Sequence, residues 1–185
     1  IILDEAQMLP TKYLTPCLAA IRELTENYGS TVVLCTATQP ALGDLMPETV
    51  RIREIAPDPP RLYEAFRRVE VTQLGQMDDD EIASELRQRP QALCIVNSRS
   101  HARELYRLIS DQEGAFHLSA SMCPRHRSEE LDTIRNTLKE GAPCRVISTQ
   151  LVEAGVDLDF PVVFRASAGL DSIAQAAGRC NREGK

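Results

Sequence analysis

Two adjacent carboxylates, Asp4 and Glu5, directly follow an apolar run at the start of the chain. Residues 1–3 are predicted to form a buried strand, and in open α/β sheets the functional groups lie at the carboxyl ends of strands. Such a pair suits a phosphate-bound magnesium ion, with Asp4 holding the metal through water and Glu5 orienting an attacking water. Taken alone, the two residues are explained at least as well by an acidic turn after a strand.

Two threonines, Thr36 and Thr38, follow the next apolar run, residues 32–35. We expect this run to be a second buried strand, so the threonines would stand beside the acidic pair at the same edge of the sheet. Their hydroxyl groups could relay hydrogen bonds between a phosphate site and the elements packed around it. By themselves, they fit a capped turn equally well.

A third group of polar residues follows the apolar run 145–148. Thr149 could donate a hydrogen bond to a nucleic-acid phosphate. Gly155 would allow a close approach of the backbone, and Asp157 could reach a nucleotide ribose or a catalytic arginine. The pattern of strand exit, short turn with glycine, and acid is more specific than either motif before it.

A basic helix face is predicted for the last segment of the chain. At about 100° per residue, Gln175, Arg179 and Arg182 share one face, and small or apolar residues lie roughly opposite. Arginines placed in this way suit the stabilisation of charge on a transferring phosphoryl group, which contributes about 10³ to 10⁵ in rate. The alternative for the arginines alone is a solvated basic face.

The elements that must position these residues are short β-rich runs that alternate with helical patterns. This alternation predicts βαβ units and a parallel sheet, and therefore an α/β fold. The expected strands are residues 1–3, 31–35, 69–72, 92–96, 145–148 and 162–164. The expected helices run from a Thr15 cap to Gly29, over 100–114, and over 124–141, with glycine ending each one. The acidic run 78–81 is expected to cap a further helix rather than to bind a metal.

A proline cluster at residues 56–60 divides the chain, because it can continue neither a helix nor a central strand. We therefore expect two domains, residues 1–57 and 58–185. The length of 185 residues exceeds one typical domain of about 150. An apolar run is already under way at Ile1, so we expect the chain to be cut from a longer protein.

The composition is that of an ordinary globular protein, with 43% hydrophobic and 26% charged residues, which excludes a disordered tail. The net charge of −6 gives no overall positive field for nucleic acid, although local phosphate contacts stay open. No apolar run approaches the ~20 residues of a membrane span. The six cysteines show no C-x-x-C spacing, and we expect reduced thiols in a cytoplasmic protein.

Together, the four segments resemble motifs II, III, V and VI of the superfamily 2 helicase motor, in this order and spacing. Residues 4–10 (DEAQMLP), 34–42 (LCTATQPAL) and 148–157 (STQLVEAGVD) are similar to the CRISPR-associated helicase-nuclease of type I systems. The resemblance covers essentially the whole chain. It implies an ATP-dependent translocase or helicase on single-stranded DNA, built of RecA-like domains. Residues 1–57 would be the last part of the first domain and residues 58–185 most of the second.

The resemblance also implies a role for each matching residue. Asp4 and Glu5 would be catalytic and would meet Mg²⁺, while Thr36 and Thr38 would couple ATP hydrolysis to movement. The remaining residues would be Arg179 and Arg182 for catalysis; Gln7, Gly155, Asp157 and Gln175 for ATP; and Ser98, Arg99 and Thr149 for DNA. Ser98 and Arg99 follow the expected strand 92–96 and resemble motif IV, which is a weaker match. A CRISPR surveillance complex would be the protein partner.

Two parts of the family pattern are not found. The only Gly-Lys pair, Gly184-Lys185, does not fit the phosphate-binding loop G-x-x-x-x-G-K-[ST], so we expect this chain alone not to hydrolyse ATP. The three histidines are dispersed and none precedes an aspartate, so no nuclease activity is expected either. The low aromatic content of 4% favours contacts with the DNA backbone over base stacking.

Two other functions compete with this hypothesis. Another superfamily 2 motor, such as a repair helicase or a restriction translocase, would lack an upstream nuclease domain. A non-catalytic RecA-like module would use its basic residues only for binding. The presence together of Asp4, Glu5, Arg179 and Arg182 argues against the second, because a module without catalysis has no chemical need for all four.

Overall fold

The chain divides into two compact units, Ile1–Phe66 (unit 1) and Arg67–Lys185 (unit 2), in a computed structural model. The structure describes residues 1–36, 45–46, 50–153, 155–182 and 184. The units divide after α2 (Pro59–Ala65), whereas the sequence places the boundary at the proline cluster that begins this helix. The assignment of residues 1–57 and 58–185 to two RecA-like domains stays a prediction.

Unit 1 contains a parallel strand pair with a helix in the connection. Strand β1 (Ile2–Leu3) pairs with β2 (Val33–Leu34). Between them lie the short 3₁₀ helices η1 (Ala6–Met8) and η2 (Thr11–Tyr13) and the helix α1 (Leu14–Glu26). Leu18 and Ile21 are the buried residues of α1, and they pack against Leu3 and Leu34. The strand–helix–strand order predicted for this part of the sequence is confirmed.

The two ends of α1 differ in how well the sequence predicted them. Thr15 is not the N-cap, because η2 leads directly into α1 and Tyr13 occupies the cap position without a side-chain hydrogen bond. At the other end, α1 stops at Glu26 with Asn27 as its C-cap, and the predicted stop residue Gly29 lies in the turn just beyond. Its φ is +59°, and the amide of Ser30 donates to the carbonyl of Leu24 at 2.9 Å. Glycine suits this position because it adopts a left-handed backbone without the steric cost that a Cβ would bring.

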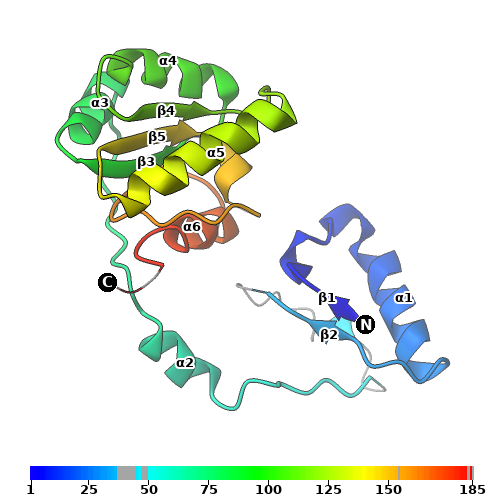
Figure 1. Cartoon of the computed structure of the whole chain (residues 1–185). Coiled ribbons are helices and arrows are strands. Elements are labelled where there is room, and N and C mark those ends of the chain that lie inside the picture. Colours follow the sequence, from blue (N-terminus) through cyan, green and yellow to red (C-terminus); the bar gives the residue numbers. More distant parts are fainter. Residues whose placement is uncertain (37–44, 47–49, 154, 183, 185) are drawn as a thin grey trace. The chain divides into compact units, whose positions relative to one another are not determined.

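Unit 2 is built around a four-stranded parallel sheet with the order β4-β5-β3-β6. The strands are β3 (Gln91–Ile95), β4 (Ala115–Leu118), β5 (Cys144–Ser148) and β6 (Val163–Arg165). The helices are α3 (Asp79–Arg87), α4 (Arg99–Ile109), α5 (Pro124–Lys139) and α6 (Leu170–Ala177). Helices α3 and α4 cover one face of the sheet, and α5 and α6 cover the other (Figure 1).

The central strand β3 packs against both helix layers. Leu93 and Ile95 belong to the apolar cluster under α5 and α6, while Cys94 belongs to the cluster under α3 and α4. Successive side chains of a strand point to opposite faces, so a strand covered on both faces must be apolar throughout. This explains why the run 92–96 predicted a strand so clearly.

Two strand predictions were wrong. Residues 69–72 form no strand, and Val71 is 70% exposed, so β-branched residues alone did not make a strand there. The sequence also missed β4, which is four residues long and contains His117. It forms because β5 offers a free edge, with Ala115 opposite Arg145. In both cases the availability of a partner strand, rather than local propensity, decided the outcome.

The helix caps of unit 2 follow the sequence in two of three cases. Asp78 accepts a hydrogen bond from the amide of Glu81, whose carboxylate accepts from the amide of Asp78, so the acidic run is a capping box. Gly141 closes α5 with a φ of +71°. Gly114 does not end α4, which stops at Ile109; instead Gly114 turns the chain into β4. Within the described part of the chain, no helix has the length and apolar character that crossing a membrane requires.

Candidate nucleotide and nucleic-acid sites

The acidic pair lies at a tight turn after β1. Glu5 has a φ of +54°, and its amide donates to the carboxylate of Asp4 at 3.0 Å. The amide of Ala6 then donates to the carbonyl of Cys35 at 3.0 Å, so the chain stays attached to the end of β2. Both carboxylates are exposed. The turn therefore presents Asp4 and Glu5 at the carboxyl edge of the β1–β2 pair, where the sequence predicted them.

Gln7 links the acidic pair to the residue after β2. Its side-chain amide donates to the carboxylate of Glu5, and its side-chain carbonyl accepts from the hydroxyl of Thr36. The sequence predicted Gln7 as a nucleotide contact and Thr36 as a coupling residue, but it did not predict that they touch. Thr38 lies outside the described residues.

The donor set around Asp4 and Glu5 fits a magnesium ion that is bound together with phosphate. Mg²⁺ is usually held by one or two carboxylates, with substrate phosphates and waters as its other ligands. Among the described residues, no group of three or more histidine, cysteine, aspartate or glutamate side chains is placed to hold a metal. Asp4 and Glu5 could therefore contribute to a metal–nucleotide site, but they could not form an all-protein metal cage.

In unit 2, the carboxyl ends of all four strands lie at one edge of the sheet, because the strands are parallel. Ser98 follows β3 and caps α4, with its hydroxyl accepting from the amide of His101 at 3.2 Å. Arg99 donates to the hydroxyl of Ser121, which follows β4, at 3.0 Å. The two predicted DNA contacts after β3 thus lie at this edge and already have partners within the protein.

Thr149 and Gly155 follow β5 at the same edge. Thr149 is 8% exposed and precedes the 3₁₀ helix η4 (Gln150–Val152). Gly155 has a φ of +69°, and no described atom lies within 4 Å of the place a Cβ would take. A left-handed backbone therefore favours glycine here, and the close approach of the backbone that the sequence suggested stays a prediction.

The predicted basic helix face was wrong, because α6 ends at Ala177. Beyond it the chain returns along the sheet: Phe160 and Cys180 form a β-bridge, and the amide of Phe160 donates to the carbonyl of Arg179 at 2.9 Å. Gln175 lies in α6 and is half-buried. Since the helix stops before the two arginines, their directions are set by this bridged segment and not by helical periodicity.

Arg179 is 9% exposed and binds the backbone of the loop after β5. Its Nε donates to the carbonyl of Val152 at 2.8 Å, and its Nη2 donates to the carbonyl of Glu153 at 2.7 Å. Thr149 begins the same loop. The structure thus brings Arg179 to the segment that carries the predicted DNA contact, a connection that the sequence did not show.

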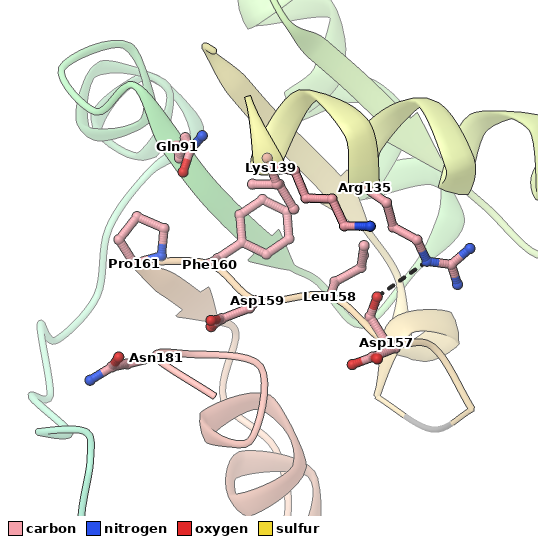
Figure 2. Close-up of a pocket in the computed structure, with 10 residues that line it drawn as sticks. Gln91, Arg135, Lys139, Asp157, Leu158, Asp159, Phe160, Pro161 and Asn181 are labelled. Carbon is pink, nitrogen blue, oxygen red and sulfur yellow. Dashed lines mark hydrogen bonds between the residues drawn. The ribbon is translucent and has the colours of Figure 1, made fainter. Parts of the chain in front are cut away.

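Arg182 and Asp157 form a second group. Arg182 Nη1 lies 3.3 Å from Asp157 Oδ1, and the amide of Arg182 donates to Asp159 at 2.7 Å. Asp157 and Asp159 also line a cavity of about 460 Å³. In Figure 2, Asp157 lies at one side of it, where Arg135 of α5 donates to the Asp157 backbone carbonyl, and Asn181 lies at another. The sequence predicted that Arg179 and Arg182 share one helix face. In the structure, Arg179 binds the backbone of the loop after β5, whereas Arg182 pairs with the Asp157 carboxylate.

Sequence reasoning also missed a buried ion pair at the carboxyl edge. Arg165 ends β6, Glu153 follows η4, and Arg165 Nε lies 2.8 Å from Glu153 Oε1. Both side chains are at least nine-tenths buried, with 7% and 6% of their surface exposed. The sequence offered one signal for this pair: the charged residue Arg165 directly follows the apolar run 162–164.

Burial sets the protonation of several groups in unit 2. All six cysteines lie in the described part of the chain and are free. Burial raises the pKa of the Cys94 thiol and that of the Cys144 thiol to about 12, so both are neutral and poor nucleophiles. Burial, with a smaller contribution from Arg103, lowers the pKa of His117, which favours its neutral form.

Comparison with known proteins identifies the family. The family model described as "CRISPR-associated nuclease/helicase Cas3, C-terminal" matches residues 88–185. The CRISPR-associated nuclease/helicase Cas3 of Haloferax volcanii is 38% identical over 123 residues, which cover 60% of this chain and 13% of that protein. The chain thus spans only a small part of the length of this relative.

Solved structures show the same fold at lower sequence identity. The crystal structure of T. fusca Cas3 with ATP aligns with a TM-score of 0.70 at 20% identity and covers 98% of this chain and 26% of that chain. A chain of a CRISPR RNA-guided surveillance complex in a pre-nicking state gives a TM-score of 0.68 at 17% identity, covering 98% and 28%. The fold is therefore the α/β, RecA-like fold of helicases, with parallel sheets. The chain belongs to the family of CRISPR-associated Cas3 nuclease/helicases and is related to their C-terminal helicase region.

Proposed function

We propose that this chain forms part of the ATP-dependent motor of a Cas3-type protein, which moves along single-stranded DNA during CRISPR interference. It would comprise the last part of one RecA-like domain and most of a second. Membership of the Cas3 family supports the proposal. The observation that carries it is the contact of Gln7 with both Glu5 and Thr36, because a motor needs its catalytic carboxylate to be connected to the neighbouring strand.

Unit 1 would meet ATP and Mg²⁺ through Asp4 and Glu5. The metal would neutralise negative charge on the phosphates, and Glu5 would orient the attacking water. Gln7 holds the Glu5 carboxylate in one orientation, and Thr36 holds Gln7. A change at Glu5 during hydrolysis would therefore reach the segment after β2 through two hydrogen bonds.

Unit 2 would contact the DNA backbone through Thr149, Ser98 and Arg99, which all lie at the carboxyl edge of its sheet. Contacts with phosphates and sugars carry no sequence information, which suits a motor that must move along any sequence. Arg179 binds the loop that Thr149 begins. A role of Arg179 in sensing the nucleotide would therefore act directly on a DNA-contacting segment.

The proposed cofactors, the remaining nucleotide-binding residues and the partners are inferred from membership of the Cas3 family. ATP and Mg²⁺ would be the cofactors, and residues Gly155, Asp157, Gln175 and Arg182 are proposed to contribute to nucleotide binding or catalysis. The partners would be single-stranded DNA and a CRISPR surveillance complex. The solved relatives include a Cas3 structure with ATP and a chain of a surveillance complex.

The test is the DNA-stimulated ATPase activity of the complete protein that carries this sequence. We expect Glu5→Gln to lower kcat by about 100-fold or more, because the variant loses the group that orients the attacking water. Binding of ATP, measured by fluorescence with a labelled analogue, should persist. The matched control is Glu64→Gln, which changes an exposed carboxylate of α2 in the same unit and should leave kcat unchanged.

Three results would each contradict part of the proposal. A complete protein whose ATPase does not respond to single-stranded DNA is not a DNA motor, and the non-catalytic binding module would then be favoured. A Glu5→Gln variant that keeps the wild-type kcat would show that the carboxylate after β1 is not catalytic. Activity without any link to CRISPR interference would favour another superfamily 2 motor.

A further inference from the structure

The buried ion pair of Arg165 and Glu153 makes hydrogen bonds to several other segments of unit 2. Besides Glu153, Arg165 contacts the end of β3: its Nη1 donates to Asn97 Oδ1 at 2.6 Å. The same Nη1 donates to the carbonyl of Ala166 at 2.9 Å, and the side-chain Nδ2 of Asn97 donates to the carbonyl of Ser167 at 2.8 Å. One guanidinium group therefore joins the ends of β3 and β6 to the loop after β5.

The sheet register explains why these groups meet. Ile95 of β3 lies opposite both Ser148 of β5 and Arg165 of β6, so the three side chains form one row across the sheet. Residues of one row point to the same face, and Ile95 belongs to the cluster under α5 and α6. Arg165 thus emerges on the face where the chain leaves β5 for η4 and Glu153.

Glu153 extends the network to the C-terminal turn, because its backbone carbonyl accepts from Arg179 Nη2 at 2.7 Å. The loop after β5 is consequently held from two sides. Arg165 holds the Glu153 side chain, and Arg179 holds its backbone. The segments joined in this way are those that carry the predicted DNA contacts, Ser98 and Thr149, and the predicted nucleotide sensor Arg179.

Stability alone is a poor explanation for this pair. Removing two charges from water offsets most of their attraction, and a buried ion pair is often no more stable than apolar residues of similar volume. The pair is also incompletely satisfied. Arg165 Nη2 and Ser148 Oγ are buried without a hydrogen-bond partner among the described residues, and the Nε–Oε1 contact is an ion pair without aligned hydrogen-bond geometry. A polar cluster that adds little stability but joins three segments is better suited to fixing their positions.

We infer that Arg165 is a positioning residue, which with Glu153 sets the loops after β3 and β5 relative to each other and to Arg179. Through this network, DNA bound at the carboxyl edge would affect the turn that responds to the nucleotide. Arg165 itself need not touch DNA or ATP. The inference rests on the proposed motor function, and it names a residue pair through which DNA stimulates the ATPase.

The experiment compares variants of the complete protein by the ratio of DNA-saturated to basal ATPase rate. Arg165→Lys keeps the charge, but an ammonium cannot span Asn97 and Glu153 as the planar guanidinium does. A second variant, Arg165→Met with Glu153→Gln, removes both charges, so that no unpaired charge is left buried if the single variant folds poorly. We expect the ratio to fall about tenfold in both.

The matched control is Arg145→Lys. Arg145 is also buried, at 9% exposed, and it donates to the carbonyls of Leu86, Glu113 and Arg87, but it lies near the amino end of β5, away from the predicted sites. A loss of folded protein lowers both rates equally and leaves their ratio unchanged. The ratio therefore separates positioning from stability, and Arg145→Lys should keep it within about twofold of wild type.

Hydrogen exchange gives a readout that does not depend on the activity. Arg165→Lys should speed amide exchange at residues 97–99 and 150–153, and leave the amides of β4 unchanged. An unchanged ATPase ratio in Arg165→Lys, or an equal fall in Arg145→Lys, would overturn the inference. A wild-type protein without DNA-stimulated ATPase would instead refute the proposed function. In that case, hydrogen exchange alone would test the positioning role of Arg165. An Arg165→Lys variant with the same exchange rates as wild type at residues 97–99 and 150–153 would exclude it.

Discussion

Gly114 offers a sharp test of how unit 2 is packed. It turns the chain into β4 with a φ of +68°, and a Cβ added to it would lie 1.8 Å from the carbonyl oxygen of Pro143 and 2.5 Å from the carbonyl carbon. Backbone atoms cannot swing away as the end of a side chain can. Gly114→Ala must therefore displace the segment before β5, next to the 2.6 Å hydrogen bond from the Arg145 amide to the Gly114 carbonyl.

The expected magnitude has two parts that a second glycine can separate. Gly141 has almost the same φ, +71°, but no described atom lies within 4 Å of its added Cβ. Gly141→Ala should therefore cost only the left-handed backbone strain, about 1–2 kcal/mol. Gly114→Ala should cost that strain plus the displacement of packed backbone, about 1–3 kcal/mol more. Its total of about 2–5 kcal/mol is a large share of the roughly 5–15 kcal/mol that stabilises a typical protein.

The assay is urea unfolding of the 185-residue chain and its two variants, followed by circular dichroism, with linear extrapolation to water. Because the chain has two units, the transition of unit 2 is followed, and both variants lie in that unit. The slope m should stay unchanged, since the surface exposed on unfolding is the same. If the two variants lose the same free energy of unfolding within about 0.5 kcal/mol, the close approach to Pro143 does not matter and the reasoning is refuted.

Two further predictions concern titratable groups in unit 2. The pKa of His117 is lowered in the folded protein, mainly by burial and also by Arg103, so the unfolded chain binds a proton more readily. The free energy of unfolding should therefore be highest above about pH 6.5 and fall as the pH is lowered through the window just below it. Urea unfolding across this range should show a shallower fall for His117→Gln, and an identical fall in both proteins would contradict the prediction. Cys94 and Cys144, whose pKa values are raised to about 12, should resist a thiol reagent at neutral pH in the native protein, while the exposed Cys123 reacts. Mass spectrometry of the labelled peptides measures this, and equal labelling of all three would show that the two strand cysteines are accessible.

Local signals in the sequence were sufficient for most of the elements. The end of α5 at Gly141, the turn at Gly29 after α1, and the capping box of Asp78 with Glu81 need only residues close in the chain. They could therefore be recognised without the fold. The apolar run 92–96 could also be recognised as a buried strand, because a strand buried on both faces has no polar positions. Prediction failed where the outcome depended on a partner distant in the sequence. Residues 69–72 were predicted as a strand but pair with no other strand, and β4 was missed although it pairs with the edge of β5.

The candidate sites divide in the same way. The sequence by itself identified the helicase family and placed Asp4, Glu5 and Thr149 after strands, because the order of motifs and the types of residue are local properties of the chain. Only the tertiary structure decided which groups touch. The parallel pairing of β1 with β2 brings Thr36 to Gln7, and the early end of α6 turns Arg179 toward the loop after β5. The pairing of Arg165 with Glu153 depends on the strand order, which brings residues distant in sequence to one edge, and no local pattern encodes that order.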